Sequence, residues 1–381
     1  MQELHTIFAT GKSRKEGASP TVAKSASFAF FPLPANARWP PTRRAEYHLI
    51  MQAVSVISTV LNEVAEVDAL VDSLIGQSLV PAEIIIVDGG SNDGTWEKLL
   101  AAKARCSALL PIRDESCSLK GSPGPIGRGR NVAIARASSD IIACADAGCV
   151  YVPGWLESLT APILSGNADY SLGGSWIDPN GRTVWDIASA PFLGISLTTD
   201  AKTKSCTARS MAFRKAVWET VGGFPETSFL FDDTGFDLSV RNIRKPAFVE
   251  DAKALYRPHL TLKTAVGQIA RYGFADGVAG IRRPRFFRNL ARCVALAAAL
   301  LLLPKTAIPL VGVLLLECYF ALRLDWKSFL QVATPGSVAA RLLYSLIVPW
   351  AVSWNYVAGA ITKSNKPNAQ NASLGEVRPQ R

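Results

Sequence analysis

The stretch AEIIIVDGGSNDGT, residues 82–95, decides the fold. Its run Ile84–Val87 is apolar without alternation, which is typical of a strand buried on both faces. The strand ends at Asp88, and a turn rich in Gly, Asn and Asp follows. A helix is expected from Thr95. The stretch therefore predicts a buried strand that delivers one carboxylate to the edge of a sheet.

The same pattern occurs along residues 53–148. AVSVIST (53–59), SALLPI (107–112) and DIIACADAG (140–148) are short apolar runs, separated by segments with helical periodicity such as EVDALVDSLIGQS (66–78). Alternating strands and helices predict an α/β fold, with a mostly parallel sheet and helices on both faces. Ligands bind beyond the carboxyl ends of such strands, where Asp146 is expected beside the acid at position 88.

Composition narrows the classes of function. The net charge of +10 suits acidic partners such as phosphorylated substrates or anionic lipid. Nucleic acid is not expected, because the basic residues cluster near the C-terminal apolar segments and no helix-turn-helix or RNP-like motif is present. Seven Cys without C-x-x-C spacing indicate reduced thiols, and three His exclude a His-rich metal site.

Four segments are expected along the chain. Residues 1–50 are polar and aperiodic, and are interpreted as disordered or as an extension before a start at Met51. Residues 51–280 form the catalytic domain and residues 281–362 a membrane-associated region. Residues 363–381 form a polar tail.

The membrane-associated region begins with IRRPRFFRNLARC (281–293), which carries five Arg and no acid and suits a helix at a membrane surface. Apolar segments follow at 294–303, 307–324 and 342–361, and the last two approach the roughly 20 residues that a span requires. Two or three membrane-embedded helices are predicted, with the catalytic domain on the cytoplasmic side of the inner membrane. The alternative is a very apolar helical domain.

Six motifs then occur in a fixed order. They are VSVISTVLNE (54–63), EIIIVDGGSNDGT (83–95), the segment 127–159, FRKAVWETVGGFPE (213–226), FDDTGFDLSVR (231–241) and QIARY (268–272). Together they resemble the family 2 glycosyltransferases, which have the GT-A fold, and most closely those with C-terminal membrane helices. The resemblance implies inverting transfer of a sugar from a nucleotide-diphosphate donor to a lipid-linked or polymeric acceptor.

The resemblance also implies roles in binding the donor. Glu63 and Asp88 would contact the base and ribose, and Asp146 would lie near the ribose and diphosphate. Gln268 and Arg271 stand where processive members carry Q-x-x-R-W. The last position of that motif is Tyr272, which is assigned to the acceptor side with Trp176. Core packing is the alternative role for Trp176 and for Phe224.

The reaction itself needs a base and a cation. An attacking hydroxyl must lose its proton to a carboxylate within ~3 Å. Asp233 is the candidate base and Asp232 the second choice, whereas Asp237 is expected on a helix surface. The departing nucleoside diphosphate needs positive charge, which the family obtains from a divalent ion on a D-x-D motif.

Here Gly148 replaces the second acid of that motif. Three solutions stay open: Mg²⁺ or Mn²⁺ on Asp146 with water and phosphate oxygens, a further ligand such as His259, or fixed arginines in place of the metal. Arg271 is the first such arginine, and Arg128 and Arg130 are possible helpers.

The missing acid also supports a second hypothesis, a non-catalytic homologue that binds nucleotide-sugar or glycan. A nucleotidyltransferase would need a basic, Gly-rich loop after the first strand. VLNEVAEVD (60–68) has neither property.

Overall fold

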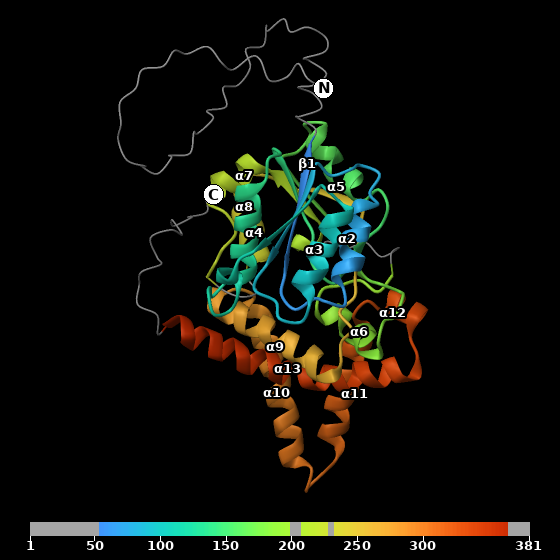
Figure 1. Ribbon diagram of the computed structural model, residues 1–381. Helices are drawn as coiled ribbons and strands as arrows, with labels where there is room; N and C mark the ends of the chain where they lie inside the picture. Colours follow the sequence, from blue (N-terminus) through green and yellow to red (C-terminus); the bar gives the residue numbers. More distant parts are fainter. Residues whose placement is uncertain (1–52, 199–206, 228–231, 365–381) are drawn as a thin grey trace, which may run out of the picture. The chain divides into compact units, whose positions relative to one another are not determined.

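The computed structural model describes residues 53–198, 207–227 and 232–364, all within the compact unit Glu46–Arg381. The extension expected at 1–50, and the tail from residue 365, lie outside the described residues. Within this unit, Figure 1 shows a twisted sheet with helices on its faces and a group of C-terminal helices at one end.

The sheet has eight strands in two parts. In spatial order they are β3 (Leu109–Arg113), β2 (Glu83–Asp88), β1 (Val54–Val60), β4 (Ile141–Cys144), β7 (Met211–Arg214), β6 (Tyr170–Ile177), β8 (Ala247–Tyr256) and β5 (Cys149–Tyr151). The first four run parallel to one another, whereas β7 is antiparallel to both β4 and β6. In the remainder, β8 is parallel to β6 and antiparallel to β5.

The register of the parallel strands places the site. Val60 pairs with Asp88 across β1 and β2, and Ile57 pairs with Cys144 across β1 and β4. Residues that follow these strands therefore emerge at one edge of the sheet. β1, β2 and β4 are buried almost throughout, as their unbroken apolar runs predict.

Helices cover both faces of the sheet. On one face lie α2 (Val67–Ile75), α3 (Thr95–Arg105) and α5 (Trp155–Leu164); on the other lie α4 (Pro125–Arg136), α7 (Lys215–Val221) and α8 (Asp232–Arg241). Each group closes its own buried apolar cluster, so the α/β fold with helices on both faces is confirmed. Short helices connect them: η1 (Glu115–Cys117), α6 (Val184–Ser189), η2 (Ala190–Phe192) and η3 (Ala208–Ser210).

The C-terminal helices are α9 (Leu262–Ala279), α10 (Arg283–Leu302), α11 (Ile308–Arg323), α12 (Trp326–Val332) and α13 (Pro335–Ser364). α9 and α13 pack with their backbones in contact. A Cβ on Gly277 would lie 2.1 Å from the Tyr356 carbonyl oxygen, and one on Gly359 would lie 2.2 Å from the Phe274 carbonyl oxygen. Only glycine permits so close an approach at these two positions.

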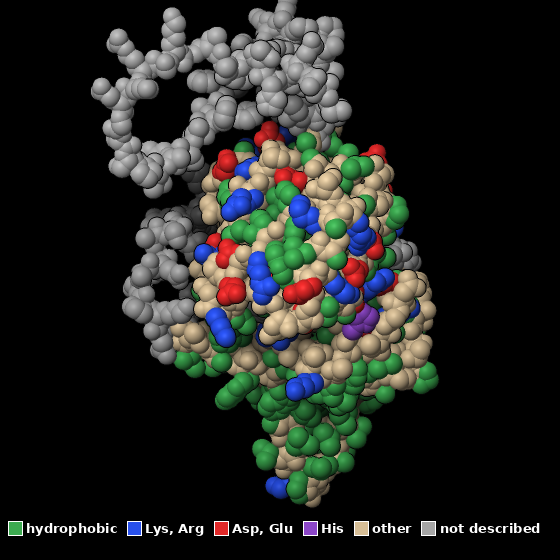
Figure 2. Space-filling model, viewed as in Figure 1, with side chains coloured by type: hydrophobic (Ala, Val, Ile, Leu, Met, Phe, Trp, Pro, Cys, Tyr) green, Lys and Arg blue, Asp and Glu red, His purple; other side chains and the backbone are tan. Residues whose placement is uncertain are grey.

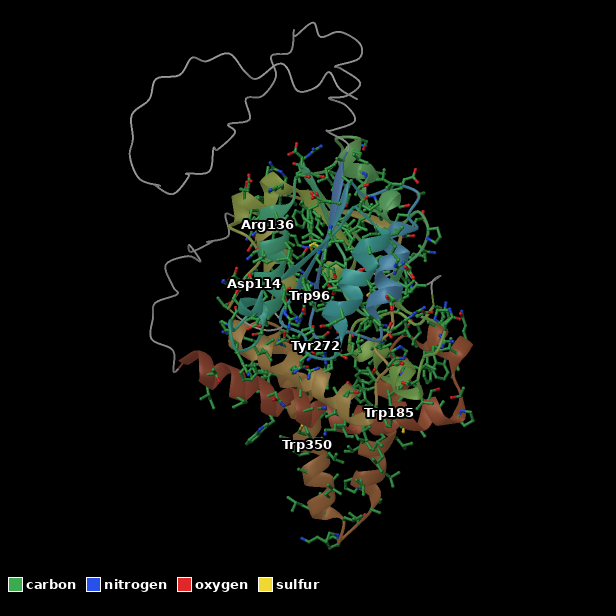
Figure 3. All side chains as sticks on the ribbon, viewed as in Figure 1. Trp96, Asp114, Arg136, Trp185, Tyr272 and Trp350 are labelled. Carbon is green, nitrogen blue, oxygen red and sulfur yellow. The ribbon has the colours of Figure 1, made fainter. Side chains whose placement is uncertain are left out.

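Among the described residues, α13 is the one helix that is long and apolar enough to span a membrane, and half of the relevant segment is buried inside the protein. Its Arg341 and Tyr344 are fully buried. Tyr356 stacks on Phe286 and is 8% exposed, because α13 turns this face towards its neighbours. Trp350 and Trp354 are exposed, and Trp350 projects from α13 in Figure 3.

α10 and α11 form a hairpin that carries exposed apolar side chains. Leu301, Ile308 and Leu315 are among the most exposed of them. Figure 2 shows these side chains as a continuous apolar surface over the projecting hairpin. At about 1.5 Å per residue, the 16 residues of α11 are shorter than the roughly 30 Å of a bilayer core.

Candidate active site

Asp88 lies at the end of β2, and its side chain is completely buried. One carboxylate oxygen, Oδ1, accepts hydrogen bonds from the backbone nitrogen of Ser91 at 2.9 Å and from its hydroxyl at 2.5 Å. The other oxygen, Oδ2, has no hydrogen-bond partner within the described part of the chain. A buried carboxylate oxygen without a donor is costly, so this oxygen is available to an N–H or O–H group of a ligand.

Glu63 follows β1 at the same edge of the sheet. Its backbone nitrogen donates to Thr95 Oγ1 at 2.8 Å, which attaches this loop to the start of α3. Burial, followed in order of effect by the nearby acids Glu66, Asp93 and Asp146, raises the pKa of its carboxyl to about 7. The structure therefore gathers Glu63 and Asp146 in one acidic region, as the strand ends predict.

Arg130 joins two of the predicted acids. The residue lies on α4, is 4% exposed, and donates from Nη2 to Asp146 Oδ1 at 2.5 Å and from Nη1 to Asp232 Oδ2. Burial alone lowers the pKa of this guanidinium, but the charges of Asp146 and Asp233 outweigh it and the net pKa is raised. Arg130 was predicted only as a possible helper; its central place depends on contacts that no local motif encodes.

Of the predicted catalytic acids, Asp233 is the one whose side chain lines a cavity. It lies in the first turn of α8. Its neighbour Asp232 is buried against Arg130, so the two acids have different surroundings. The cavity has a volume of about 890 Å³ and is also lined by Arg209 and Tyr272. Figure 3 labels Tyr272 where α9 meets the sheet.

The other two α9 residues have separate environments. Gln268 donates from Nε2 to the Tyr272 hydroxyl at 3.4 Å, and its Oε1 is buried with no partner among the residues described. Arg271 is exposed and forms no ion pair with any described residue. It does not line the cavity that holds Asp233.

Several aromatic and acidic residues lie in the core. Trp176 is 2% exposed with Lys253 over its ring, and Phe224 stacks on Phe236 at 4.1 Å, which fits core packing better than contact with a sugar. The expectation that Asp237 lies on a helix surface is wrong. Its carboxylate is buried and accepts hydrogen bonds from Tyr170 and Arg241, because this face of α8 turns towards the sheet.

Sequence reasoning missed Arg209. It lies on η3, its guanidinium stacks 4.3 Å over the Tyr256 ring, and no carboxylate of a described residue pairs with it. Its segment, TARS (207–210), carries no recognisable motif. Its charge lies near Asp146 only in the folded protein, because the two residues are far apart in the sequence.

A metal ion fits this site only with help from a ligand. The described residues hold no cluster of three or more His, Cys, Asp or Glu suited to a metal. Asp146 already receives Arg130, and Gly148 has a φ of 72° with no side chain. His259 pairs with Glu66 at 3.3 Å and is half-exposed. Hard cations accept few protein ligands when phosphate oxygens and water supply the rest, so Asp146 fits such an ion with a diphosphate as co-ligand.

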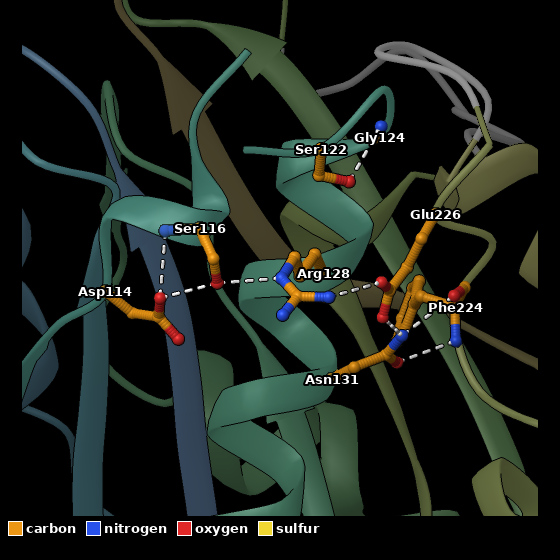
Figure 4. Close-up of polar contacts among 8 residues, drawn as sticks. All are labelled: Asp114, Ser116, Ser122, Gly124, Arg128, Asn131, Phe224 and Glu226. Atoms are coloured by element: carbon orange, nitrogen blue, oxygen red, sulfur yellow. Dashed lines mark hydrogen bonds and ion pairs between the residues drawn. The ribbon is translucent and has the colours of Figure 1, made fainter. Parts of the chain in front are cut away.

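A separate polar network positions the start of α4. Figure 4 shows Arg128 between Ser116 and Glu226, with distances of 2.8 Å from Nε to the hydroxyl and 3.2 Å from Nη1 to the carboxylate. Asn131 donates to the same Glu226 and to the carbonyl of Phe224. Arg128 is therefore bound within this network, whereas Arg130, two residues later, faces the acids.

Residues 55–222 match the family described as Glycosyl transferase family 2. This segment is a family 2 glycosyltransferase domain. The predicted enzyme class is thereby confirmed. No curated protein sequence matches the chain closely enough to count as a relative.

Solved structures show a distant likeness to this glycosyltransferase. TarS 1-349 from S. aureus has a TM-score of 0.43 at 18% identity, covering 82% of this chain and 91% of that one. The mannosyltransferase PcManGT from Pyrobaculum calidifontis, in complex with GDP-Man and Mn²⁺, has a TM-score of 0.46 at 16% identity, covering 84% and 93%. These likenesses say nothing about the ligands of this glycosyltransferase.

Replacing Arg130 by lysine should uncouple the two acids. Lysine keeps the charge but lacks the planar fork, so it reaches one carboxylate and leaves the other buried without a donor. We expect turnover to fall about 100-fold and the free energy of unfolding to fall by about 1–3 kcal/mol. Nucleotide release measures turnover, and thermal unfolding measures the change in stability. Arg128→Lys is the control, since its partly exposed ion pair contributes about 0–1 kcal/mol, and equal effects of the two changes would contradict the bridging role.

Glu63 should make stability depend on pH. Its pKa of about 7 exceeds the ordinary value of 4.5, so the folded protein retains a proton that the unfolded chain has lost between these values. Stability should therefore fall as pH rises from about 4.5 to about 7, by on the order of 1–2 kcal/mol after solvent screening.

In Glu63→Gln this decline should disappear, because glutamine does not titrate. Melting temperatures at about pH 5 and about pH 8 measure the decline. The exposed Glu97→Gln should retain it. A decline in Glu63→Gln as steep as in the parent would show that other groups cause it.

Proposed function

We propose that this enzyme is an inverting glycosyltransferase that moves a sugar from a nucleotide-diphosphate donor to a hydroxyl, or a phosphate, of a lipid-linked or polymeric acceptor. The observation that carries the proposal is the placement of Asp233. Its carboxylate lines the cavity of about 890 Å³ at the helix N-terminus of α8, while its neighbour Asp232 is paired with Arg130. A carboxylate that lines a cavity and has no cation paired with it among the described residues is placed as a general base requires.

The donor would bind along the strand ends. Asp88 Oδ2 is buried and unpaired, so it can accept a hydrogen bond from a base N–H or ribose O–H. Glu63 has a pKa of about 7 and can donate or accept near neutral pH. Asp146 lies near Glu63 and shares Arg130 with Asp232, the neighbour of the candidate base, which suits the ribose and diphosphate.

The departing nucleoside diphosphate would be met by several positive charges. Arg130 is fixed between two acids, whereas Arg209 and Arg271 have no carboxylate partner among the described residues. Fixed donors aimed at developing charge need no reorganisation during the reaction. Asp146 and the donor diphosphate would hold Mg²⁺ or Mn²⁺, which when bound would supply further positive charge to the leaving group.

Attachment to the inner membrane, with the catalytic domain in the cytoplasm, is part of the proposal. The exposed apolar hairpin α10–α11 would enter the bilayer, because no described residue covers its surface and that surface is too apolar for water. Five Arg at positions 282–292 precede or begin the hairpin, which suits the cytoplasmic side of a membrane. Half of α13 is buried, so this helix would lie along the protein rather than cross the bilayer alone.

The second candidate is a non-catalytic homologue that binds nucleotide-sugar or glycan. Gly148 favours it, because the position offers no metal-binding oxygen from a side chain. The arrangement of Asp233, Arg130 and the cavity favours catalysis instead.

Asp233→Asn should abolish transfer and leave donor binding intact. The amide cannot accept the acceptor proton, so we expect turnover to fall by about 10²–10⁴-fold. Nucleotide-diphosphate release with a panel of nucleotide sugars measures turnover, and nucleotide titration measures binding. The matched control is Asp251→Asn, an exposed acid on β8. If no donor turns over and both variants bind nucleotide like the parent, the non-catalytic candidate is favoured.

Gly148→Asp should strengthen binding of a divalent ion. The φ of 72° is one that Asp and Asn adopt more readily than other residues, and a Cβ would contact Tyr256 at an ordinary 3.6 Å. An added carboxylate increases the negative charge of the site, so the Mn²⁺ concentration for half-maximal turnover should fall roughly tenfold.

Gly148→Asn has nearly the same shape without the charge and should show less than about a threefold change. EDTA titrations with restored Mn²⁺ compare the two variants with the parent. Full turnover of the parent in EDTA would contradict metal use and leave the arginines to neutralise the leaving group.

A further inference from the structure

The cavity beside Asp233 is strongly basic. Six arginines and three aspartates line it, and the arginines come from η3, from the start of α10 and from the end of α11. Arg282 and Arg285 both pair with Asp276, at nitrogen–oxygen distances of 2.5 Å and 3.9 Å, so one carboxylate is shared by two arginines. Arg292 is paired with Glu317.

The remaining three arginines have no acidic partner among the described residues. Arg209 stacks on the Tyr256 ring, Arg323 lies 5.8 Å over Tyr319, and Arg288 is exposed. Burial lowers the pKa of Arg285, and the neighbouring Arg282 and Arg288 lower it further against the opposing effect of Asp276. Positive charge thus exceeds negative charge in a partly enclosed space, which an anion would relieve.

Apolar residues also line the cavity. Phe192, Leu193, Phe320, Leu324 and Val348 contribute to the same cavity. Phe320 and Leu324 lie at or just beyond the end of α11, whose exposed leucines continue away from the cavity along the hairpin. A ligand that fills this space needs an anionic part against the arginines and an apolar part towards the hairpin.

The donor nucleotide does not meet this description. Glu63, Asp88 and Asp146, which would hold it, are absent from the lining of the cavity. Asp233 is the one predicted catalytic acid that belongs to the lining, so the occupant would present its reacting group there.

We propose that this cavity binds the phosphate or diphosphate of a lipid-linked acceptor, with Arg288 and Arg323 contacting the phosphate oxygens and the apolar chain leaving along α10 and α11. The inference rests on the proposed glycosyltransferase function and specifies its acceptor class. Arginine suits phosphate because its planar fork forms two parallel hydrogen bonds. A volume of about 890 Å³ accommodates such a head group, since ligand sites span about 300–1,000 Å³.

The test measures binding of farnesyl phosphate to the full chain in an uncharged detergent. Arg288→Gln and Arg323→Gln should each weaken binding about tenfold or more, because each removes a charge-assisted hydrogen bond. The control is Arg283→Gln, an exposed arginine of α10 outside the lining, which should change binding less than about twofold. None of the three should alter binding of the donor nucleotide, which separates failure of this inference from failure of the proposed function.

Three further probes identify the source of the ligand chemistry. Farnesol and inorganic phosphate should bind at least about tenfold more weakly than farnesyl phosphate, because each lacks one part of the ligand. Vesicles of phosphatidylglycerol should not displace it. Equal binding of farnesol, equal binding of inorganic phosphate, displacement by phosphatidylglycerol, or an equal loss in Arg283→Gln would each overturn the proposal.

Discussion

The rest of the site depends on the two ion pairs of the buried Arg130 guanidinium. It comes from α4 and binds Asp146 at the end of β4 and Asp232 at the start of α8. Two carboxylates that bind one guanidinium would repel each other without the cation between them. Arg130 thereby sets the distance between the strand ends, where the donor is proposed to bind, and the helix that carries Asp233.

Acidic and basic residues gather on opposite sides of Arg130. Acids gather on the strand side, where Glu63 is surrounded by Glu66, Asp93 and Asp146 and its pKa rises to about 7. Arginines gather on the other side, in the cavity that Asp233 shares with Arg209 and the start of α10. The proposed transfer, from a diphosphate donor to an acceptor at a membrane, needs both environments side by side.

The C-terminal helices are part of the catalytic unit. α9 supplies Tyr272 to the cavity and packs on α13 through Gly277, where a larger residue would meet the Tyr356 carbonyl. This packing explains why α13 is apolar, since much of it contacts protein. The exposed leucines of α10 and α11 have no such contact with the described residues, which fits the proposed attachment to a membrane.

The sequence by itself determined the α/β fold and the strand-end acids Asp88 and Asp146. Both follow from local patterns: unbroken apolar runs form buried strands, and parallel strands end at one edge. Even the start of α3 at Thr95 could be predicted from its turn.

Only the tertiary structure decided which groups meet. Arg130 and Asp232 are 102 positions apart, so their pairing depends on how α8 packs and not on spacing in a motif. The same is true of the buried Asp237, of Arg209 in the cavity, and of α13 as a packed helix. Periodicity shows that a residue lies in a helix or strand, but the partner that neutralises or buries its side chain comes from a distant part of the chain.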